Sequence, residues 1–272
     1  MVDHSDSVKV LALGSSNMYA AFNPRLVTNS FNLANSFQRL EYDYYLLNRY
    51  STKLRNLSVV VLGVDYVNIS FPQHSVDVYD RHRTVSYKLY MGYPKGSSLS
   101  INNYEFSCNK TFLRKVELCF QHLLGKQVDM SCDSLGHATY YKLNNKSASD
   151  MSDSYGKKVL GITDFSDSNV LSNFVYIGKI AELCEKTNAH LVIVSTPVWS
   201  TMRNQFIPDN LNKFRNLLNA VIEEYPNISY YDLTDDPHYT FDDYYDANHL
   251  SEYGALKFSK QIASFVTDDC YN

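Results

Sequence analysis

The 272-residue sequence has few cysteines, no long apolar run and no excess of basic residues. Its five cysteines are an odd number without a C-x-x-C pair, which argues against a zinc ribbon and against a disulfide framework. No apolar stretch approaches the roughly 18 residues that a helix needs to cross a bilayer. The formal net charge of -4 supplies no general attraction for nucleic acid. We therefore expect a soluble protein that does not act on nucleic acid.

The start of the chain does not resemble a secretory signal peptide, because polar and charged residues occupy positions 3–6. As the chain is written, we expect a cytoplasmic protein. A location at the cell surface or in the periplasm is expected if an N-terminal anchor precedes this sequence. The sequence does not indicate an oligomeric state.

The apolar residues that are present gather in short runs separated by helical patterns. Such runs, bounded by turn residues, predict buried parallel strands over 8–13, 57–64 and 190–197. Residues 31–35 and 228–233 are expected to form two further strands. Helical spacing predicts a short helix from residue 18 that ends before Pro24, and longer helices over 38–50, 170–186, 210–225 and 251–265. Alternating strands and helices predict a three-layer α/β/α sandwich with a parallel sheet of about five strands, formed by a single domain over 1–272.

Residues 75–165 interrupt this alternation. They are rich in Ser, Asn, Tyr and Gly, with one amphipathic stretch over 112–124. A long insertion of this kind in an α/β domain is typical of a lid or a binding region. We expect this segment to cover the functional site.

Two groups of polar residues follow predicted strands at the same edge of the sheet. Gly14, Ser15 and Ser16 form a small-residue turn after the first strand, and Asp246 and His249 precede the last helix. The carboxyl ends of parallel strands share one edge, where reacting groups gather in open α/β sheets. A nucleophilic serine needs a base, and the base needs an orienting acid. The pattern predicts Ser16 as nucleophile, His249 as base and Asp246 as the acid that orients it.

With these residues in place, the sequence resembles the SGNH (GDSL-like) hydrolase and acyltransferase superfamily. Residues 11–16 look like its first block, with Ser15 where Asp is usual, and residues 246–251 look like its last block, D-x-x-H. The Gly-Ser-Ser form resembles members that act on cell-surface polysaccharides and teichoic acids. The resemblance covers both ends of the predicted core but not residues 75–165, and it implies the flavodoxin-like fold of this superfamily.

The resemblance also implies an oxyanion hole with three donors. One is the Ser16 amide, and the second is an amide after strand two, where Asn35 and Ser36 stand in place of the usual Gly. The third is usually an Asn, but Asp65 occupies that position. An ionised carboxylate cannot donate a hydrogen bond. The third donor is then expected to be Asn17 or Asn35, or else Asp65 in its protonated form.

Other interpretations of the same residues remain open. The turn before the first helix is also a pattern that binds phosphate, although the sequence has neither a Walker lysine nor G-x-G-x-x-G. Asp235 and His238 repeat the D-x-x-H spacing closer to the fifth strand. A metal site can be imagined in one polar stretch, where a solvated loop is the favoured interpretation; its residues are His74, Asp77, Asp80 and His82.

The function expected from the sequence is that of a serine esterase or O-acyltransferase with a covalent acyl-Ser16 intermediate. The acylated glycan as substrate is implied by the resemblance alone, a small ester is the other expected substrate, and the chemistry needs neither metal nor cofactor. The alternative is a catalytically inactive relative that binds a glycan or a partner protein.

Overall fold

The computed structural model describes residues 2–72, 87–88, 91–93, 116–117, 120–121, 123–124 and 131–270. Five strands form one parallel sheet in the order β2-β1-β3-β4-β5. They are β1 (Val10–Leu13), β2 (Ser30–Asn32), β3 (Val59–Gly63), β4 (His190–Ser195) and β5 (Ile228–Asp232). This is the flavodoxin-like strand order, and the predicted α/β class with a five-stranded parallel sheet is confirmed.

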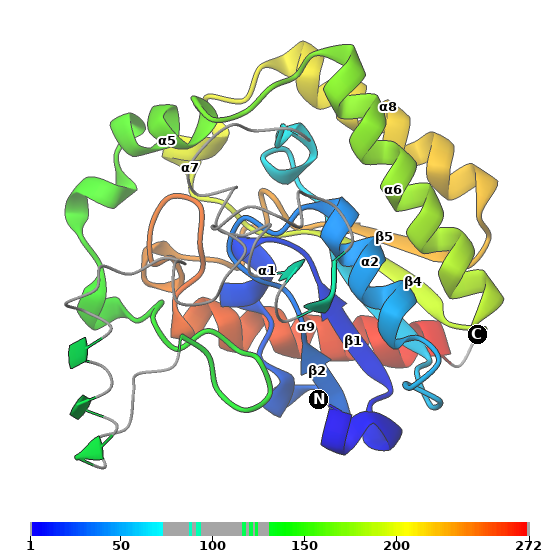
Figure 1. Cartoon of the computed structure of the whole chain (residues 1–272). Coiled ribbons are helices and arrows are strands. Elements are labelled where there is room, and N and C mark those ends of the chain that lie inside the picture. Colours follow the sequence, from blue (N-terminus) through cyan, green and yellow to red (C-terminus); the bar gives the residue numbers. More distant parts are fainter. Residues whose placement is uncertain are drawn as a thin grey trace. The chain divides into compact units, whose positions relative to one another are not determined.

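Helices cover both faces of the sheet (Figure 1). One face carries α2 (Leu40–Tyr50), α6 (Asp167–Lys186) and α8 (Pro208–Glu224), and the other carries α1 (Ser16–Ala21) and α9 (Glu252–Cys270). Shorter helices occupy the connections: η1 (Val2–Ser7), η2 (Pro24–Leu26), η3 (Asn68–Ser70), η6 (Leu143–Asn145), η7 (Ala148–Met151), α5 (Asp153–Leu160), α7 (Ser200–Arg203) and η8 (Phe241–Asp243).

The central strands are buried on both faces, which explains their unbroken apolar sequence. Along β3, Val60 and Leu62 pack toward α2 and α6, whereas Val59 and Val61 pack toward α1 and α9. All four side chains are fully buried. Burial of a Val or Leu side chain stabilises the fold by about 1.5–3 kcal/mol. The central strands therefore form a firmly packed base for the residues that follow their carboxyl ends.

The second strand is shorter than the predicted 31–35 and ends at Asn32. The Asn32 carboxamide accepts from the Ala34 amide and donates to the carbonyls of Met18 and Phe22. The last helix begins as predicted, since the Ser251 hydroxyl accepts from the Tyr253 and Gly254 amides.

The chain divides into two compact units, one formed by residues 1–73 with 132–272 and the other by residues 74–131. Residues 132–165, which the sequence assigns to the insertion, belong to the first unit together with the sheet. The amphipathic stretch over 112–124 and the polar group at 74–82 fall mainly or wholly outside the described residues. The covering role of residues 75–165 stays a prediction.

None of the helices in the described part of the chain combines the length and apolarity of a membrane-spanning segment. The same residues hold no cluster of three or more His, Cys, Asp or Glu side chains arranged around a common point.

Candidate active site

The turn after β1 presents Ser16 at the start of α1. Gly14 has φ +134°, a backbone conformation that L side chains rarely adopt, so a glycine is required there. Gly63, at the end of β3, allows Met18 of α1 to lie against the sheet, where a Cβ at position 63 would overlap the Met18 side chain. These two glycines seat α1 closely, so that Ser16 lies at the carboxyl edge of the sheet. As the first residue of α1, Ser16 also contributes an amide that has no partner inside the helix.

His249 joins this serine to Asp246 through both of its ring nitrogens. Its Nε2 lies 2.8 Å from the Ser16 Oγ, and its Nδ1 lies 2.9 Å from Asp246 Oδ2 and 3.0 Å from Oδ1. The side chains of His249 and Asp246 are 12% and 4% exposed. The structure therefore brings together the three residues that the sequence proposes as nucleophile, base and orienting acid. Nδ1–H facing a carboxylate leaves Nε2 as the atom that can accept the serine proton.

The loop that carries the histidine is fixed from several sides. Its central residue, Ala247, donates its amide to the Asp150 carbonyl and accepts from the Trp199 amide, at 2.9 and 3.0 Å. Leu250 is buried and anchors the end of the loop in the core, as expected from the sequence. The ring of Tyr141 packs 5.0 Å from the imidazole of His249, centroid to centroid. The orientation of the imidazole is thus set before a substrate binds.

Asp246 is held as a carboxylate despite its burial. Burial alone would raise its pKa, but the charge of His249, the His249 hydrogen bond, the Asn248 amide and the Tyr155 hydroxyl outweigh that effect and keep the pKa below its ordinary value. The Tyr155 hydroxyl donates to Asp246 Oδ2 at 2.9 Å. Sequence reasoning missed Tyr155, because it lies in α5, within the segment that the sequence assigns to an insertion.

Replacing Tyr155 with phenylalanine is expected to lower kcat/KM about 10- to 100-fold at neutral pH, because one hydrogen bond to a charged group is worth about 1.5–3 kcal/mol. The lost bond moves the pKa of Asp246 upward. Asp246 orients His249 only while it is ionised, and a carboxylate with a higher pKa is protonated at a higher pH. Activity in the variant should therefore decline at a higher pH than in the wild type. Rates for p-nitrophenyl acetate from pH 4 to 8 measure this, with Tyr239→Phe as the control, since the Tyr239 hydroxyl bonds to Gln261 instead. An unshifted acid limb would contradict the assignment.

The candidate donors after β2 lie in a loop that is hydrogen-bonded to the turn 14–16, called the nucleophile turn below because it carries the candidate nucleophile. The Asn35 amide donates to the Gly14 carbonyl at 3.2 Å, and the Ser36 amide donates to the Asn35 side chain at 2.8 Å. The Ser36 side chain is hydrogen-bonded to Tyr141. The loop is therefore beside Ser16, but both amides have partners within the protein. The Ser36 amide, whose partner is an exposed side chain, is the easier of the two to release to a substrate.

Asn17 and Asp65 form part of a buried chain of polar side chains. Asn17 Nδ2 donates to Asp65 Oδ2 at 3.0 Å, and Asn17 Oδ1 accepts from Asn248 Nδ2 at 3.0 Å. Asp65 Oδ1 accepts from the amides of Val67 and Asn68. Both carboxyl oxygens of Asp65 thus act as acceptors and close the turn after β3. The Asn248 amide donates to Asp246, so this network continues to the orienting acid. Sequence reasoning did not single out Asn248, although it lies inside the D-x-x-H block.

Asp65→Asn is expected to lower stability by about 1–3 kcal/mol at pH 5 while changing turnover per folded molecule little. The new amide nitrogen faces the donor on Asn17, and Asn17 and Asn248 must both turn over to relieve the clash. Burial raises the pKa of Asp65, more than its hydrogen bonds lower it, so the wild type loses stability as pH rises above the ordinary carboxyl pKa. The difference in the free energy of unfolding between the wild type and Asp65→Asn should therefore be smaller at pH 8 than at pH 5. Urea unfolding at both values measures it, and a large loss of turnover in the folded variant would instead make Asp65 part of the oxyanion site.

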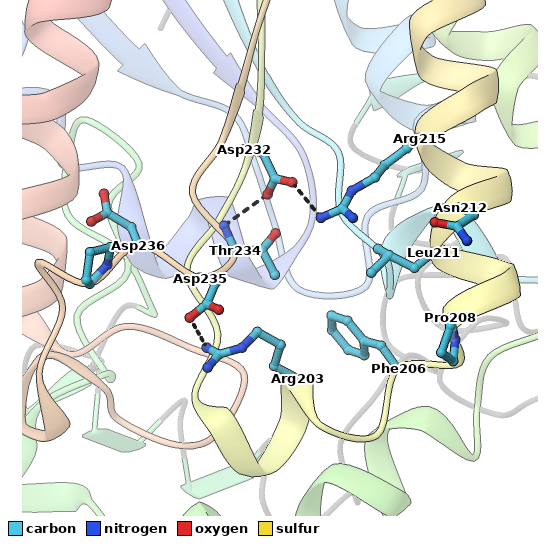
Figure 2. Close-up of a pocket in the computed structure, with 11 residues that line it drawn as sticks. Arg203, Phe206, Pro208, Leu211, Asn212, Arg215, Asp232, Thr234, Asp235 and Asp236 are labelled. Atoms are coloured by element: carbon cyan, nitrogen blue, oxygen red, sulfur yellow. Dashed lines mark hydrogen bonds and ion pairs between the residues drawn. The ribbon is translucent and has the colours of Figure 1, made fainter.

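The second D-x-x-H pair does not form. His238 Nδ1 lies 2.6 Å from Asp236, and the His238 side chain is 83% exposed. Asp235 instead pairs with Arg203 at 2.8 Å. Figure 2 shows Asp235 and Arg203 turned toward each other, with Asp232 held between Arg215 and the Thr234 amide. The spacing 235–238 therefore does not predict a contact here, because Asp236 and not Asp235 accepts from the backbone amide of His238 and lies against its ring.

These charged pairs belong to a pocket of about 680 Å³ at the end of β5. It contains none of the three residues Ser16, Asp246 and His249. Its lining consists of Arg203, Phe206, Pro208, Leu211, Asn212, Arg215, Asp232, Thr234, Asp235, Asp236 and Pro237.

No protein-family model matches this sequence, and no curated protein does. Solved structures that are similar to the chain include two from Bacteroides species. One is a protein from Bacteroides fragilis described provisionally as an acylhydrolase, with 10% identity, a TM-score of 0.42, and coverage of 97% of this chain and 93% of that one. The other is a GDSL-like lipase from Bacteroides thetaiotaomicron, with 12% identity, a TM-score of 0.40, and coverage of 98% and 91%. At this similarity neither structure assigns an activity to the chain.

Proposed function

We propose that this protein is a serine esterase or O-acyltransferase in which Ser16 is the nucleophile. The observation that carries the proposal is the continuous hydrogen-bonded path from Ser16 Oγ through His249 to Asp246. A serine, an imidazole and a buried carboxylate in this order are the parts that acyl transfer requires.

In the proposed reaction, Ser16 Oγ attacks the carbonyl carbon of an acyl ester while His249 Nε2 takes the serine proton. Asp246 stabilises the imidazolium that forms. The tetrahedral intermediate collapses as the bond to the leaving alcohol breaks, and His249 returns the proton to that alcohol oxygen. Water or a second hydroxyl group then attacks acyl-Ser16, with His249 again accepting the proton. The bond between the acyl carbon and Ser16 Oγ breaks, and His249 returns the proton to Ser16 Oγ, which restores the free serine and releases the acid or the new ester. The Ser16 amide is the first donor for the oxyanion.

The proposed substrate is an acyl ester of a glycan, acetyl being the favoured acyl group. The sequence resembles SGNH members that act on surface polysaccharides, and aromatic rings surround the base. Tyr141 packs on His249, and Tyr140 and Tyr245 pack on Tyr141. The Tyr140 side chain is 59% exposed. An open aromatic face beside the reacting groups suits the apolar face of a sugar ring, and tyrosine hydroxyls suit its polar edge.

A fluorophosphonate probe tests the proposal directly, because it forms a stable bond only with an activated serine. We expect rapid labelling of the wild type, with the adduct located on Ser16 by peptide mass spectrometry. Release of acetate from acetylated xylan tests the substrate class. If the protein binds the polysaccharide but is neither labelled nor active, it is the catalytically inactive relative instead. The departures from the family pattern at Asp65 and Asn35 also fit that alternative.

Replacing residues 74–131 with a short Gly-Ser linker is expected to preserve p-nitrophenyl acetate turnover and to abolish activity on acetylated xylan. The reason is that a covering segment contributes contacts to a large acceptor but not to a small ester. The replacement must leave residues 132–165 in place, because Tyr155 contacts Asp246. Steady-state rates for both substrates measure the effect, and an equal loss of both activities would show that the segment is structural.

A further inference from the structure

A buried carboxyl group lies behind the nucleophile turn and takes no part in the proposed reaction. Asp43, in the first turn of α2, is 1% exposed, and its Oδ1 accepts the Gly14 amide at 2.9 Å. Gly14 is the residue with positive φ that turns the chain from β1 toward Ser16. The hydrogen bond from its amide therefore fixes the peptide plane from which the turn begins.

The same carboxyl oxygen also holds the loop after β2. Gln38 Nε2 donates to Asp43 Oδ1 at 2.6 Å and to the Leu33 carbonyl at 3.1 Å. The Asn35 amide then returns to the Gly14 carbonyl. The result is a closed ring of hydrogen bonds through both segments. One segment carries Ser16, and the other carries the candidate oxyanion amides.

This arrangement is costly for stability. Asp43 Oδ2 is buried and has no hydrogen-bond partner among the described residues. Burial raises the pKa of Asp43 to about 7, although the bonds from Gln38 and Gly14 oppose the shift. A buried polar atom without a partner destabilises the fold, and an apolar side chain of similar volume would avoid the penalty. Violations of this kind are expected where a residue serves function.

We propose that Asp43 is a positioning residue that, with Gln38, sets the spacing between the nucleophile turn and the loop 33–38 at the oxyanion side of the site. This inference rests on the proposed function. Asp43 touches no reacting atom, and its effect passes through the Gly14 amide and the Gln38 side chain. If this ring of hydrogen bonds is lost, the nucleophile turn and the loop 33–38 should both become more mobile, because the ring links them.

The test compares Asp43→Ala, Asp43→Asn and a matched control, Glu41→Ala, in the full chain. Glu41 is a buried carboxyl in the same helix turn, but it accepts from the Tyr176 hydroxyl of α6 instead. Amide hydrogen exchange, followed by mass spectrometry, reports the mobility of peptides that cover residues 13–18 and 33–38. Fluorophosphonate labelling reports the reactivity of Ser16. If Asp43→Ala fails to fold, Gln38→Ala removes the loop half of the ring and is read in the same way.

We expect Asp43→Ala to raise exchange about tenfold in both peptides, relative to the rest of the sheet, and to slow labelling about 10- to 100-fold. Asp43→Asn keeps an acceptor for Gly14 and should restore part of both effects. Glu41→Ala should change neither. A uniform rise in exchange across the fold, or equal effects of Asp43→Ala and Glu41→Ala, would overturn the proposal. Exchange also separates the two hypotheses, because an unlabelled wild type would refute the proposed function while exchange still decides the role of Asp43.

Discussion

Replacing Ser16 with alanine is expected to reduce ester hydrolysis by about 10⁴-fold or more, to the background rate, because removal of a nucleophile from a serine triad removes the covalent route. The fold should remain intact, since the Ser16 side chain is only partly buried and its hydroxyl bonds to His249 alone among the described contacts. Initial rates with p-nitrophenyl acetate and labelling by a fluorophosphonate measure the loss.

Ser15→Ala is the matched control for this variant. Ser15 is adjacent to Ser16, but it is 3% exposed and its side chain makes no capping bond to α1. We expect this variant to be labelled at close to the wild-type rate. Labelling that persists in Ser16→Ala and disappears in Ser15→Ala would move the nucleophile by one residue.

Removal of the His249 imidazole is expected to cost about 10⁴-fold or more in turnover, and removal of the Asp246 carboxylate about 10²- to 10⁴-fold. Under the proposed function, His249 accepts the serine proton, and Asp246 fixes which of its nitrogens is free to do so. Both variants are measured as kcat on p-nitrophenyl acetate, with circular dichroism to confirm folding.

His238→Ala is the control, because His238 also pairs with an aspartate but is largely exposed and bonded to Asp236. Its turnover should remain within about twofold of the wild type, as is usual for an exposed side chain away from the site. If His238→Ala were inactive and His249→Ala active, the assignment of the base would be wrong while that of Ser16 would stand.

The sequence predicts those parts of the site that depend on local pattern. Ser16 follows an apolar strand, and Asp246 lies three residues before His249, so spacing and strand position are sufficient to propose their contact. The strands β1, β3 and β4 are predictable from local pattern as well, because central strands buried on both faces read as nearly unbroken apolar runs.

Residues whose roles depend on distant partners could not be predicted in this way. Tyr155 reaches Asp246 across 91 positions, and Asp43 reaches Gly14 across 29. Neither lies in a recognisable pattern, because a tyrosine or an aspartate in a helix turn is ordinary on a solvated face. Asp65 is an intermediate case. Its sequence position marks it as unusual, but only the contacts with Asn17, Val67 and Asn68 show that its carboxyl group closes a turn.

The hydrogen bond between Ser16 and His249 joins residues 233 positions apart. During synthesis on the ribosome, Ser16 therefore emerges 233 residues before His249. Under the proposed function, a nascent chain has no esterase activity until α9 is being completed. The protein is thus suited to fragment complementation: a piece that ends before residue 246 and a piece that contains α9 should each be silent, and reassembly should be reported by the appearance of ester cleavage.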